Sequence, residues 1–358
     1  MNVSVVLPNY NHARELPRAL NALLQQRLSP FEIIVVDDAS TDDSVAVIRQ
    51  FQQRSPLIKI IQHPENRGAP AALNSGLSAA SGQLVYFAAA DDFTFPELFT
   101  AAATALREHP QAAFFCSVVA LMSESGELLG FRPLSPPSLR SGYIPPERVR
   151  REIKKSDNWV VGPSVIYRCD LLRDAGGFDE NLGSFCDGLV VRLLALQHGF
   201  CFSSEVHGVW QRYSTSYSSR TAMSVVNATN QIAAAVAKVR QVFPQDLCDN
   251  YASLLNRRLR FNVVRLWSLW GGKHLDVASI VTIAELNKAD RRILMLLAKL
   301  PRFRSAAIMA WITLRLHPFG VSAFLRGLYV SLVRTASYRR YFYRQYKVIR
   351  QLSDRAEV

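Results

Sequence analysis

Residues 83–96, QLVYFAAADDFTFP, decide the fold and the site that we expect. The apolar run 84–87 is typical of a buried strand, and two adjacent carboxylates, Asp91 and Asp92, follow it. Ligands of open α/β sheets bind beyond the carboxyl ends of the strands. Because adjacent acids repel each other, we expect a cation between them, and Mg2+ or Mn2+ suits carboxylate oxygen. An Asp-Asp turn that closes the strand is the alternative.

The preceding residues repeat this arrangement of strand, polar turn and helix. Buried strands are predicted at 3–7, which we expect to stop at Pro8, and at 31–36 and 57–62. Helical spacing of apolar residues is found at 16–24, 45–51 and 71–80. The alternation predicts an α/β fold with a parallel sheet and right-handed crossovers.

Polar residues far apart in the chain should converge at one edge of this sheet. Parallel strands place their carboxyl ends together, and the residues that follow them include Tyr10, Asp38, Arg67, Asp91 and Asp92. Carboxylates suit a base, ribose hydroxyls and a metal, and guanidinium suits phosphate. A nucleoside diphosphate would satisfy all of these groups. The chain lacks G-x-G-x-x-G after the first strand and lacks G-x-x-x-x-G-K-[ST], which excludes the usual dinucleotide and phosphate loops.

Composition indicates a globular protein with a basic end. Hydrophobic residues make up 49% and charged residues 20% of the 358 residues, and the net charge is +13. From Arg291 onward there are fourteen Arg and Lys against two acids, which indicates an anionic partner, either membrane lipid or nucleic acid. Five cysteines without CxxC spacing disfavour disulfides and zinc and favour a reducing compartment. We recognise no signal peptide and no apolar run of about 20 residues.

Five segments together resemble the inverting family 2 glycosyltransferases. They are VSVVLPNYN at 3–11, IIVVDDASTD at 33–42, ENRGAPAALNSGLSAASG at 65–82, ADDFTFPELF at 90–99 and GGFDENLG at 176–183, the last followed by Asp187. They occur in the order found in that family. The resemblance implies a GT-A fold, a Rossmann-like sheet of the nucleotide-diphospho-sugar transferase type, followed here by an α-helical C-terminal region.

The resemblance also implies roles at matching positions of the nucleotide site. Pro8 and Tyr10 match the turn around the base, and Asp38 matches the acid that bonds the base. Arg67 falls in the segment that approaches the donor diphosphate. Asp91 matches the acid that contacts ribose and the metal shell.

Three further positions would serve the metal and the reaction. Asp92 matches the metal ligand, with Mn2+ or Mg2+ as cofactor, and Asp187 matches the catalytic base. Arg212, in a Trp-Arg segment, would reach the diphosphate. These roles imply transfer of a sugar from a nucleotide-diphosphate donor to a hydroxyl by single displacement. UDP is favoured only by its frequency in the family, and the acceptor would be a glycan or a lipid-linked molecule.

Two positions depart from the family pattern. Ala89 stands where a further acid is often found, and Cys186 stands where Glu commonly precedes the base. A catalytically inactive sugar-nucleotide-binding protein is therefore kept as an alternative. Locally, Asp187 also fits a helix N-cap, because an apolar helical pattern follows it. Residues 159–167 predict one strand, and Arg168 and Arg173 are interpreted as ordinary surface residues.

The chain is expected to form two domains, a catalytic domain at 1–220 and a basic helical region at 221–358. Helices are predicted at 223–243, 245–270, 275–286 and 288–300. Residues 302–352 mix Arg with aromatic residues, which suits a membrane interface. We expect peripheral attachment to the cytoplasmic face of a membrane. A nucleic-acid-binding module is the alternative, although no nucleic-acid motif is present.

Overall fold

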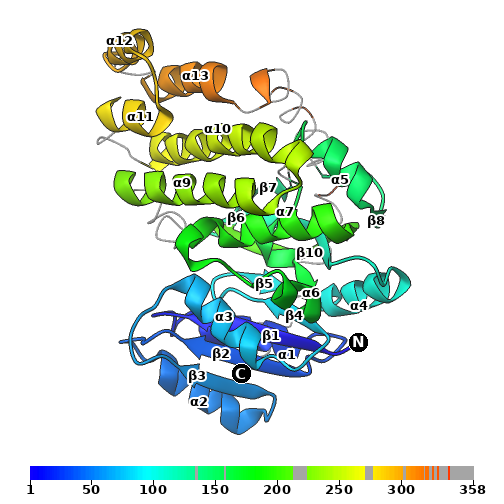
Figure 1. Ribbon diagram of the computed structural model, residues 1–358. Coiled ribbons are helices and arrows are strands. Elements are labelled where there is room, and N and C mark those ends of the chain that lie inside the picture. Colours follow the sequence, from blue (N-terminus) through cyan, green and yellow to red (C-terminus); the bar gives the residue numbers. More distant parts are fainter. Residues whose placement is uncertain are drawn as a thin grey trace. The chain divides into compact units, whose positions relative to one another are not determined.

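A computed structural model describes residues 1–133, 136–156, 159–212, 224–270, 277–300, 304–317 and 319–321, with 325, 329 and 338 (Figure 1). The side chains of Arg212 and of residues 266–270 are outside this description. The chain forms two compact units. Unit 1 comprises Met1–Glu180, Cys186–Arg212 and Tyr329–Val358, and unit 2 comprises Asn181–Phe185 and Tyr213–Leu328.

Unit 1 is built on one mixed sheet with the strand order β3-β2-β1-β4-β9-β6-β10-β5. The strands on this path are β1 (Val3–Asn9), β2 (Glu32–Asp37), β3 (Ile58–Gln62), β4 (Leu84–Phe87), β5 (Phe93–Thr94), β6 (Phe114–Ser123), β9 (Ile166–Arg168) and β10 (Phe200–Arg212). The first four strands pair in parallel, as the sequence predicts. Strand β7 (Leu128–Arg132) pairs with β6, and β8 (Gly142–Ile144) pairs with β10.

Helices cover both faces of the parallel strands. They are α1 (Leu16–Leu24), α2 (Ser44–Arg54), α3 (Ala69–Ala79) and α4 (Leu98–Glu108), followed in unit 1 by α5 (Pro146–Glu152), α6 (Cys169–Asp174) and α7 (Cys186–His198). Val5 and Leu7 join one core cluster with α1, α2 and α4. Val6 points the other way, toward Gly76 of α3. This alternation is the two-residue period of a strand that is buried on both sides.

Gly76 allows the close approach of α3 to β1. A Cβ atom at position 76 would lie 2.9 Å from Cγ2 of Val6 and closer still to Cγ1, and Val6 is fully buried. Overpacking of this kind typically costs about 1–3 kcal/mol. We therefore expect Gly76→Ala to lower the free energy of unfolding by about 2–3 kcal/mol in a urea titration.

A matched double variant separates this steric clash from a propensity effect. Val6→Ala removes the methyl groups that a new Cβ would meet, so Gly76→Ala should cost less on that background. Equal costs of Gly76→Ala on the two backgrounds would show that the contact with Val6 is not the cause.

Two strand predictions are wrong in detail. Strand β1 does not stop at Pro8 but continues to Asn9, with Pro8 opposite Val36 of β2. The pairing of β1 with β4 covers only residues 3–6. Pro8, which has no N–H, therefore has a paired strand, β2, on one side only. Residues 159–167 do not form one strand. The Gly162-Pro163 step forms a short 3-10 turn, η1 (Gly162–Ser164), before β9 begins.

Arg173 is exposed, as the sequence predicts, and Arg168 is half-buried, but tertiary hydrogen bonds hold both side chains. Arg168 donates from Nε to Ala112 O at 2.8 Å and from Nη2 to Leu106 O, in the last turn of α4. Arg173 donates to Leu77 O at 2.8 Å and to Ala80 O, at the end of α3. Both cations thus satisfy carbonyl groups at helix carboxyl ends, where the helix dipole favours positive charge.

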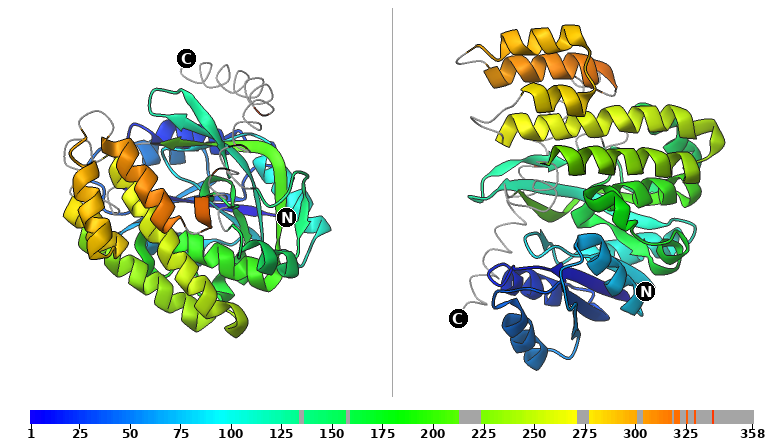
Figure 2. Two further views of the ribbon diagram at one scale, coloured as in Figure 1. Left: turned by 90° about the horizontal axis from the view of Figure 1, so that it is seen from above. Right: turned by 60° about the vertical axis from the view of Figure 1, so that its left-hand side comes forward.

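Unit 2 is a stack of helices (Figure 2). It contains α9 (Val225–Val242), α10 (Gln245–Trp270), α11 (Val277–Ala284), α12 (Lys288–Leu297) and α13 (Arg304–Leu316), and it includes most of η2 (Glu180–Phe185). The four predicted helices are confirmed. Most of residues 302–352 lie outside the described residues. Among the described helices, none combines the length and apolar composition that a bilayer-crossing segment needs.

Candidate active site

The parallel strands bring the predicted nucleotide-site residues to one edge of the sheet. Tyr10 follows β1 and is 36% exposed. Asp38 directly follows β2, whereas Asp91 and Asp92 lie in the turn after β4. Strands β2, β1 and β4 are neighbours and run in the same direction. Their carboxyl ends therefore share one edge, where ligands of such sheets bind.

Asp38 is held by three donors from the segment that follows β3. Its Oδ1 accepts from the backbone N–H of Arg67 at 2.9 Å and from His63 Nδ1 at 2.7 Å. Its Oδ2 accepts from the N–H of Gly68 at 2.7 Å. The other ring nitrogen of His63 bonds Ser75 Oγ at 2.9 Å. This network fixes the carboxylate, which is only 3% exposed.

The Asp38 carboxylate retains room for one more hydrogen bond. A carboxylate offers about four acceptor positions, and the three donors use three of them. The Arg67 side chain is exposed next to this loop. The loop therefore presents one acceptor and one guanidinium group at the same edge of the sheet.

Asp91 and Asp92 form the acidic centre of this edge. Asp92 is 7% exposed, and its Oδ1 accepts from the backbone N–H of Gln211 at 2.8 Å. Burial raises the pKa of Asp92 well above its usual range, and the charge of Asp91 raises it further. Burial likewise raises the pKa of Asp91, against the lowering effect of His12 and Arg18. The pair thus carries negative charge at an electrostatic cost, which a bound cation would relieve.

Arg18 of α1 is the cation that the protein itself brings to this turn. Its Nη2 donates to the carbonyl oxygen of Asp91 at 2.9 Å. Its guanidinium lies 5.5 Å from the ring centre of Phe93, within the range of a cation–π interaction. The buried Nε has no hydrogen-bond partner among the described residues. Arg18 therefore supports the turn from α1 and leaves donor capacity unused.

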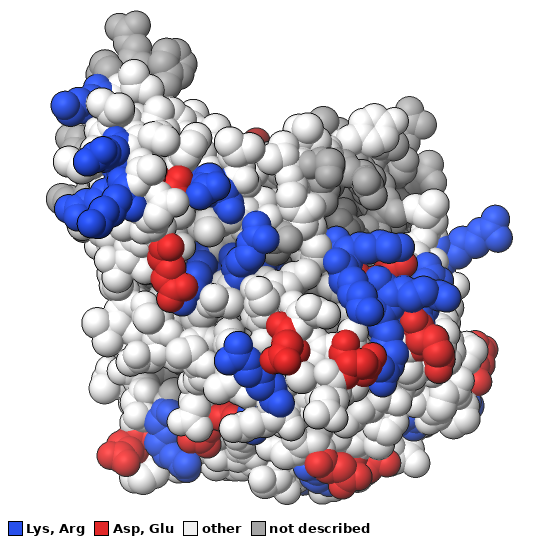
Figure 3. All heavy atoms as spheres, turned by 45° about the horizontal axis from the view of Figure 1, so that its top comes forward, with Lys and Arg blue, Asp and Glu red and all other residues white. Residues whose placement is uncertain are grey.

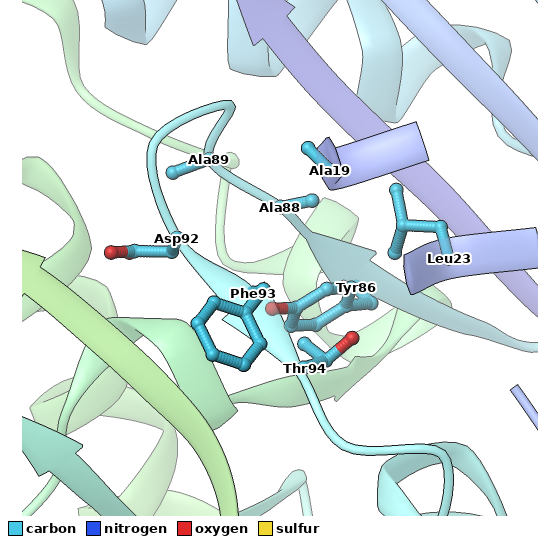
Figure 4. Close-up of a pocket in the computed structure, with 8 residues that line it drawn as sticks. All are labelled: Ala19, Leu23, Tyr86, Ala88, Ala89, Asp92, Phe93 and Thr94. Atoms are coloured by element: carbon cyan, nitrogen blue, oxygen red, sulfur yellow. The ribbon is translucent and has the colours of Figure 1, made fainter. Parts of the chain in front are cut away.

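A small pocket lies behind the acidic turn (Figure 4). Ala19 and Leu23 of α1 line one side, and Tyr86, Asp92 and Phe93 line the other. In Figure 4 the Asp92 carboxylate points away from Leu23. The lining is mainly apolar and offers one charged group, which is too little to hold a diphosphate. The pocket therefore lies next to the turn with Asp91 and Asp92 and is not itself the expected diphosphate site.

The two carboxylates fit a divalent cation that is shared with a phosphate. No group of three His, Cys, Asp or Glu side chains lies together within the part of the chain that the structure describes. Mg2+ is commonly bound by one or two carboxylates together with substrate phosphates and water. Asp91 and Asp92 provide two such carboxylates. Burial and mutual repulsion disfavour their ionisation, and a divalent cation would offset this cost.

Asp187 is exposed in the first turn of α7. Its Oδ1 accepts from the N–H of Gly188 at 2.6 Å. Its Oδ2 faces Gly162 of η1, where an added Cβ would lie 3.4 Å away. Cys186, in the helper position, is buried, and burial raises the pKa of its thiol. The thiol is therefore neutral near pH 7 and supplies no helper charge.

The turn η1 connects Asp187 with the acidic centre. The hydroxyl of Tyr86, which lines the pocket beside Asp92, donates to Pro163 O at 3.0 Å. Burial raises the pKa of Tyr86, and the charge of Asp92 adds to this effect. Gly162, the neighbour of Pro163, faces Asp187. The turn η1 thus contacts both Asp187 and Tyr86, the neighbour of Asp92 in the pocket lining.

The end of β10 also reaches this centre. Arg212 is the last residue of β10 and pairs with Ser123 of β6. Its neighbour Gln211 bonds Asp92, so the backbone of Arg212 lies beside the acidic turn. His207 of β10 bonds Ser203 Oγ at 3.2 Å, and burial lowers its pKa to about 4. A buried neutral imidazole with these neighbours is a core residue.

The sequence reading missed three residues that support the site. His63 follows β3, so the strand-end rule that found Asp38 could have found it as well. Arg18 and Tyr86 have no such signal, because one lies inside a helical pattern and the other inside an apolar run. Their roles follow from contacts between distant segments.

Comparison with known proteins identifies the catalytic region. Residues 4–175 match the family described as "Glycosyl transferase family 2". The chain contains a family 2 glycosyltransferase domain. An uncharacterized glycosyltransferase of Nostoc sp., alr2836, is 47% identical over 97 residues, which are 27% of this chain and 30% of that protein. The matched segments of the first three curated relatives span about a third of their lengths.

Further comparisons concern one curated relative and two solved structures. The poly(ribitol-phosphate) beta-N-acetylglucosaminyltransferase TarS of Staphylococcus aureus is 29% identical over 195 residues, 53% of this chain and 31% of that protein. The structure of TarS 1–349 with UDP-GlcNAc has a TM-score of 0.57 at 19% identity, covering 95% of this chain and 92% of that one. The mannosyltransferase PcManGT of Pyrobaculum calidifontis, with GDP-Man and Mn2+, has a TM-score of 0.54 at 18% identity, covering 91% and 87%. At these identities the likeness establishes the fold, so the glycosyltransferase domain has the predicted GT-A architecture.

Proposed function

We propose that the protein is a metal-dependent inverting glycosyltransferase that uses a nucleotide-diphosphate sugar. The proposal is supported by sheet order, because Asp38 and the Asp91-Asp92 pair follow the parallel strands β2 and β4 on either side of β1. It is supported as well by the turn η1, which bonds Tyr86 beside Asp92 and faces Asp187. UDP is our first candidate for the donor nucleotide. It is supported by the TarS complex with UDP-GlcNAc, whereas PcManGT binds GDP-Man.

The nucleotide would be bound by the loop that follows β3 and by the end of β1. Asp38 accepts one hydrogen bond from an N–H of the base, using the acceptor position that its three protein donors leave. Pro8 and Tyr10 border the base at the end of β1. Asp91 contacts the ribose and the metal shell, and the Arg67 guanidinium pairs with the diphosphate. A divalent ion held by Asp91 and Asp92 would neutralise charge on the leaving diphosphate.

Asp187 would act as the general base. In a single displacement the acceptor hydroxyl attacks the anomeric carbon from the face opposite to the leaving group. Asp187 removes the hydroxyl proton, and the anomeric configuration inverts. Because Asp187 is exposed and its Oδ2 faces the small residue Gly162, an acceptor hydroxyl can approach it. Arg212 would add positive charge near the diphosphate from the end of β10.

We place the reaction at the cytoplasmic face of a membrane, with a glycan or lipid-linked acceptor. All five cysteines are free and buried, which suits a reducing compartment. TarS and a relative in Bacillus spizizenii are named as glycosyltransferases of poly(ribitol-phosphate). These names support an extended glycan-type acceptor as the first class to assay.

A thermal-shift screen of nucleotide sugars, each with and without Mn2+, tests the donor and the metal together. We expect a UDP-sugar to raise the Tm and the increase to require Mn2+, since binding to the folded state stabilises it. Failure of every UDP-, GDP- and dTDP-sugar to raise the Tm would refute the proposal.

The inactive sugar-nucleotide-binding alternative rests on Ala89 and on the neutral Cys186. It predicts nucleotide binding without turnover. Donor hydrolysis with Mn2+, followed as release of the nucleoside diphosphate, separates the two functions. Slow hydrolysis that disappears in the Asp187→Asn variant supports an enzyme, whereas binding with no hydrolysis and no transfer supports the binder.

Asp38→Asn should weaken nucleotide binding by about 10- to 100-fold, from the cost of about 1–3 kcal/mol for an unsatisfied buried polar group. An asparagine cannot accept from all three donors, because its amide nitrogen would face one of the N–H groups. Titration calorimetry with UDP measures the change. Asp43→Asn is a matched control, because Asp43 is exposed and makes no side-chain cap bond to α2. Equal affinities of the two variants would contradict the assignment.

A further inference from the structure

One side of α12 and of the residues that follow it combines exposed apolar residues with exposed cations. Met295 is 52% exposed, Leu296 is 64% exposed and Leu300 is 41% exposed. Lys288, Arg291, Arg292 and Lys299 are exposed on the same segment. The opposite side of the helix, with Asp290 and Leu294, is buried. We call these seven exposed residues the α12 surface.

The acids near this surface are already engaged. Residues 285–300 contain two acids, Glu285 and Asp290. Glu285 pairs with Arg260 at 2.6 Å. Asp290 is 3% exposed and accepts two hydrogen bonds from Arg315, at 3.0 and 3.1 Å. The four cations of the α12 surface have no ion-pair partner within the described ranges, so their charge faces outward.

The helical stack leaves the α12 surface open. Helix α12 packs on α11 and α13 within unit 2, and in Figures 1 and 2 it lies at one end of that stack. Figure 3 shows Lys and Arg side chains gathered on the part of unit 2 that contains α12. Helical spacing places Lys288, Arg292 and Leu296 one turn apart along one line.

We propose that the α12 surface docks unit 2 on an anionic lipid bilayer. Long basic side chains keep their charge at the level of the headgroups while their stems and neighbouring apolar residues enter the interface. Exposed Met and Leu among outward-facing cations meet both requirements, and the negative surface potential of anionic lipid complements the charge. The inference goes beyond the sugar-transfer chemistry and is independent of it.

Flotation of the full chain with vesicles tests the docking. We expect the protein to float with phosphatidylcholine vesicles that contain phosphatidylglycerol, and not with phosphatidylcholine alone. The Lys288→Glu/Arg292→Glu/Lys299→Glu variant should lose binding by roughly 100-fold or more, since each cation contributes about fivefold. The Met295→Ser/Leu296→Ser variant should bind more weakly and dissociate at lower salt.

A matched control carries the same charge change in unit 1. Arg151, Lys154 and Lys155 are exposed at and after the end of α5, and reversing them to Glu should leave flotation unchanged. Donor-induced thermal shift should be unchanged in every variant, which separates failure of docking from failure of the proposed sugar transfer.

Four results would overturn the proposal. They are absence of flotation of the wild type with anionic vesicles, wild-type flotation of the α12 charge variant, equal loss in the α5 control, and binding to single-stranded DNA without lipid association. Self-association that the α12 variants abolish, without flotation, would assign the surface to a second copy of the chain and would also overturn it.

Discussion

Asp187→Asn is expected to lower sugar transfer by about 10²–10⁴-fold, the usual contribution of general acid–base catalysis. Asparagine keeps the shape of the side chain and can accept the N–H of Gly188 through its oxygen. It cannot accept the proton of the acceptor hydroxyl. The first turn of α7 should therefore be unchanged, and the loss should fall on kcat.

The measurement is a steady-state assay with the donor identified by the thermal-shift screen. Donor-induced stabilisation should equal that of the wild type, because Asp187 contacts the acceptor side. Asp174→Asn is the control, since Asp174 is an exposed acid at the end of α6. A kcat equal to that of the wild type would show that Asp187 is not the general base. Asp187 would then have only the helix-capping role that its local sequence also allows.

The first half of the fold could be predicted from sequence because β1, β2 and β4 are buried along nearly their whole length. Every residue of β2 is buried, so the strand is a continuous apolar run that ends in acids. In the second half β6 is a long buried strand, but other strands lack this signal. Strand β5 has two residues, β9 has three, and β10 changes register against β6 between Ser203 and Gly208. Short strands and irregular register leave no periodicity to detect.

The same contrast holds for the candidate site. Asp38, Asp91 and Asp92 follow buried strands, and sheet geometry alone brings such residues to one edge. Tyr86 could not be found in this way, because its side chain is buried and its connection to η1 is a tertiary hydrogen bond from its hydroxyl to Pro163 O. For Arg168 and Arg173 the sequence predicts a surface position, and Arg173 is exposed, but the hydrogen bonds of both cations to the carboxyl ends of two helices leave no signal in the sequence.

Asp92→Asn is expected to have opposite effects on activity and on stability. Transfer should fall by about 10²–10³-fold, the cost of removing one electrostatic contact to charge that develops in the transition state. The Tm of the protein without metal should rise. Burial and Asp91 raise the pKa of Asp92, so its ionised form costs stability at neutral pH, and a neutral amide removes that cost.

Mn2+ titration by thermal shift, in the presence of donor, measures the change in Tm and the response to metal, and a steady-state transfer assay measures the loss of activity. The wild type should gain stability from Mn2+ with donor, and Asp92→Asn should start from a higher Tm and gain little. The amide oxygen of the variant can still accept from Gln211 N–H, so the turn keeps its shape and only the charge changes. If Asp92→Asn responds to Mn2+ like the wild type, Asp92 is not a metal ligand. Its role would then be the hydrogen bond that it makes after the end of the strand. The acidic pair would then be the structural turn that its sequence also permits.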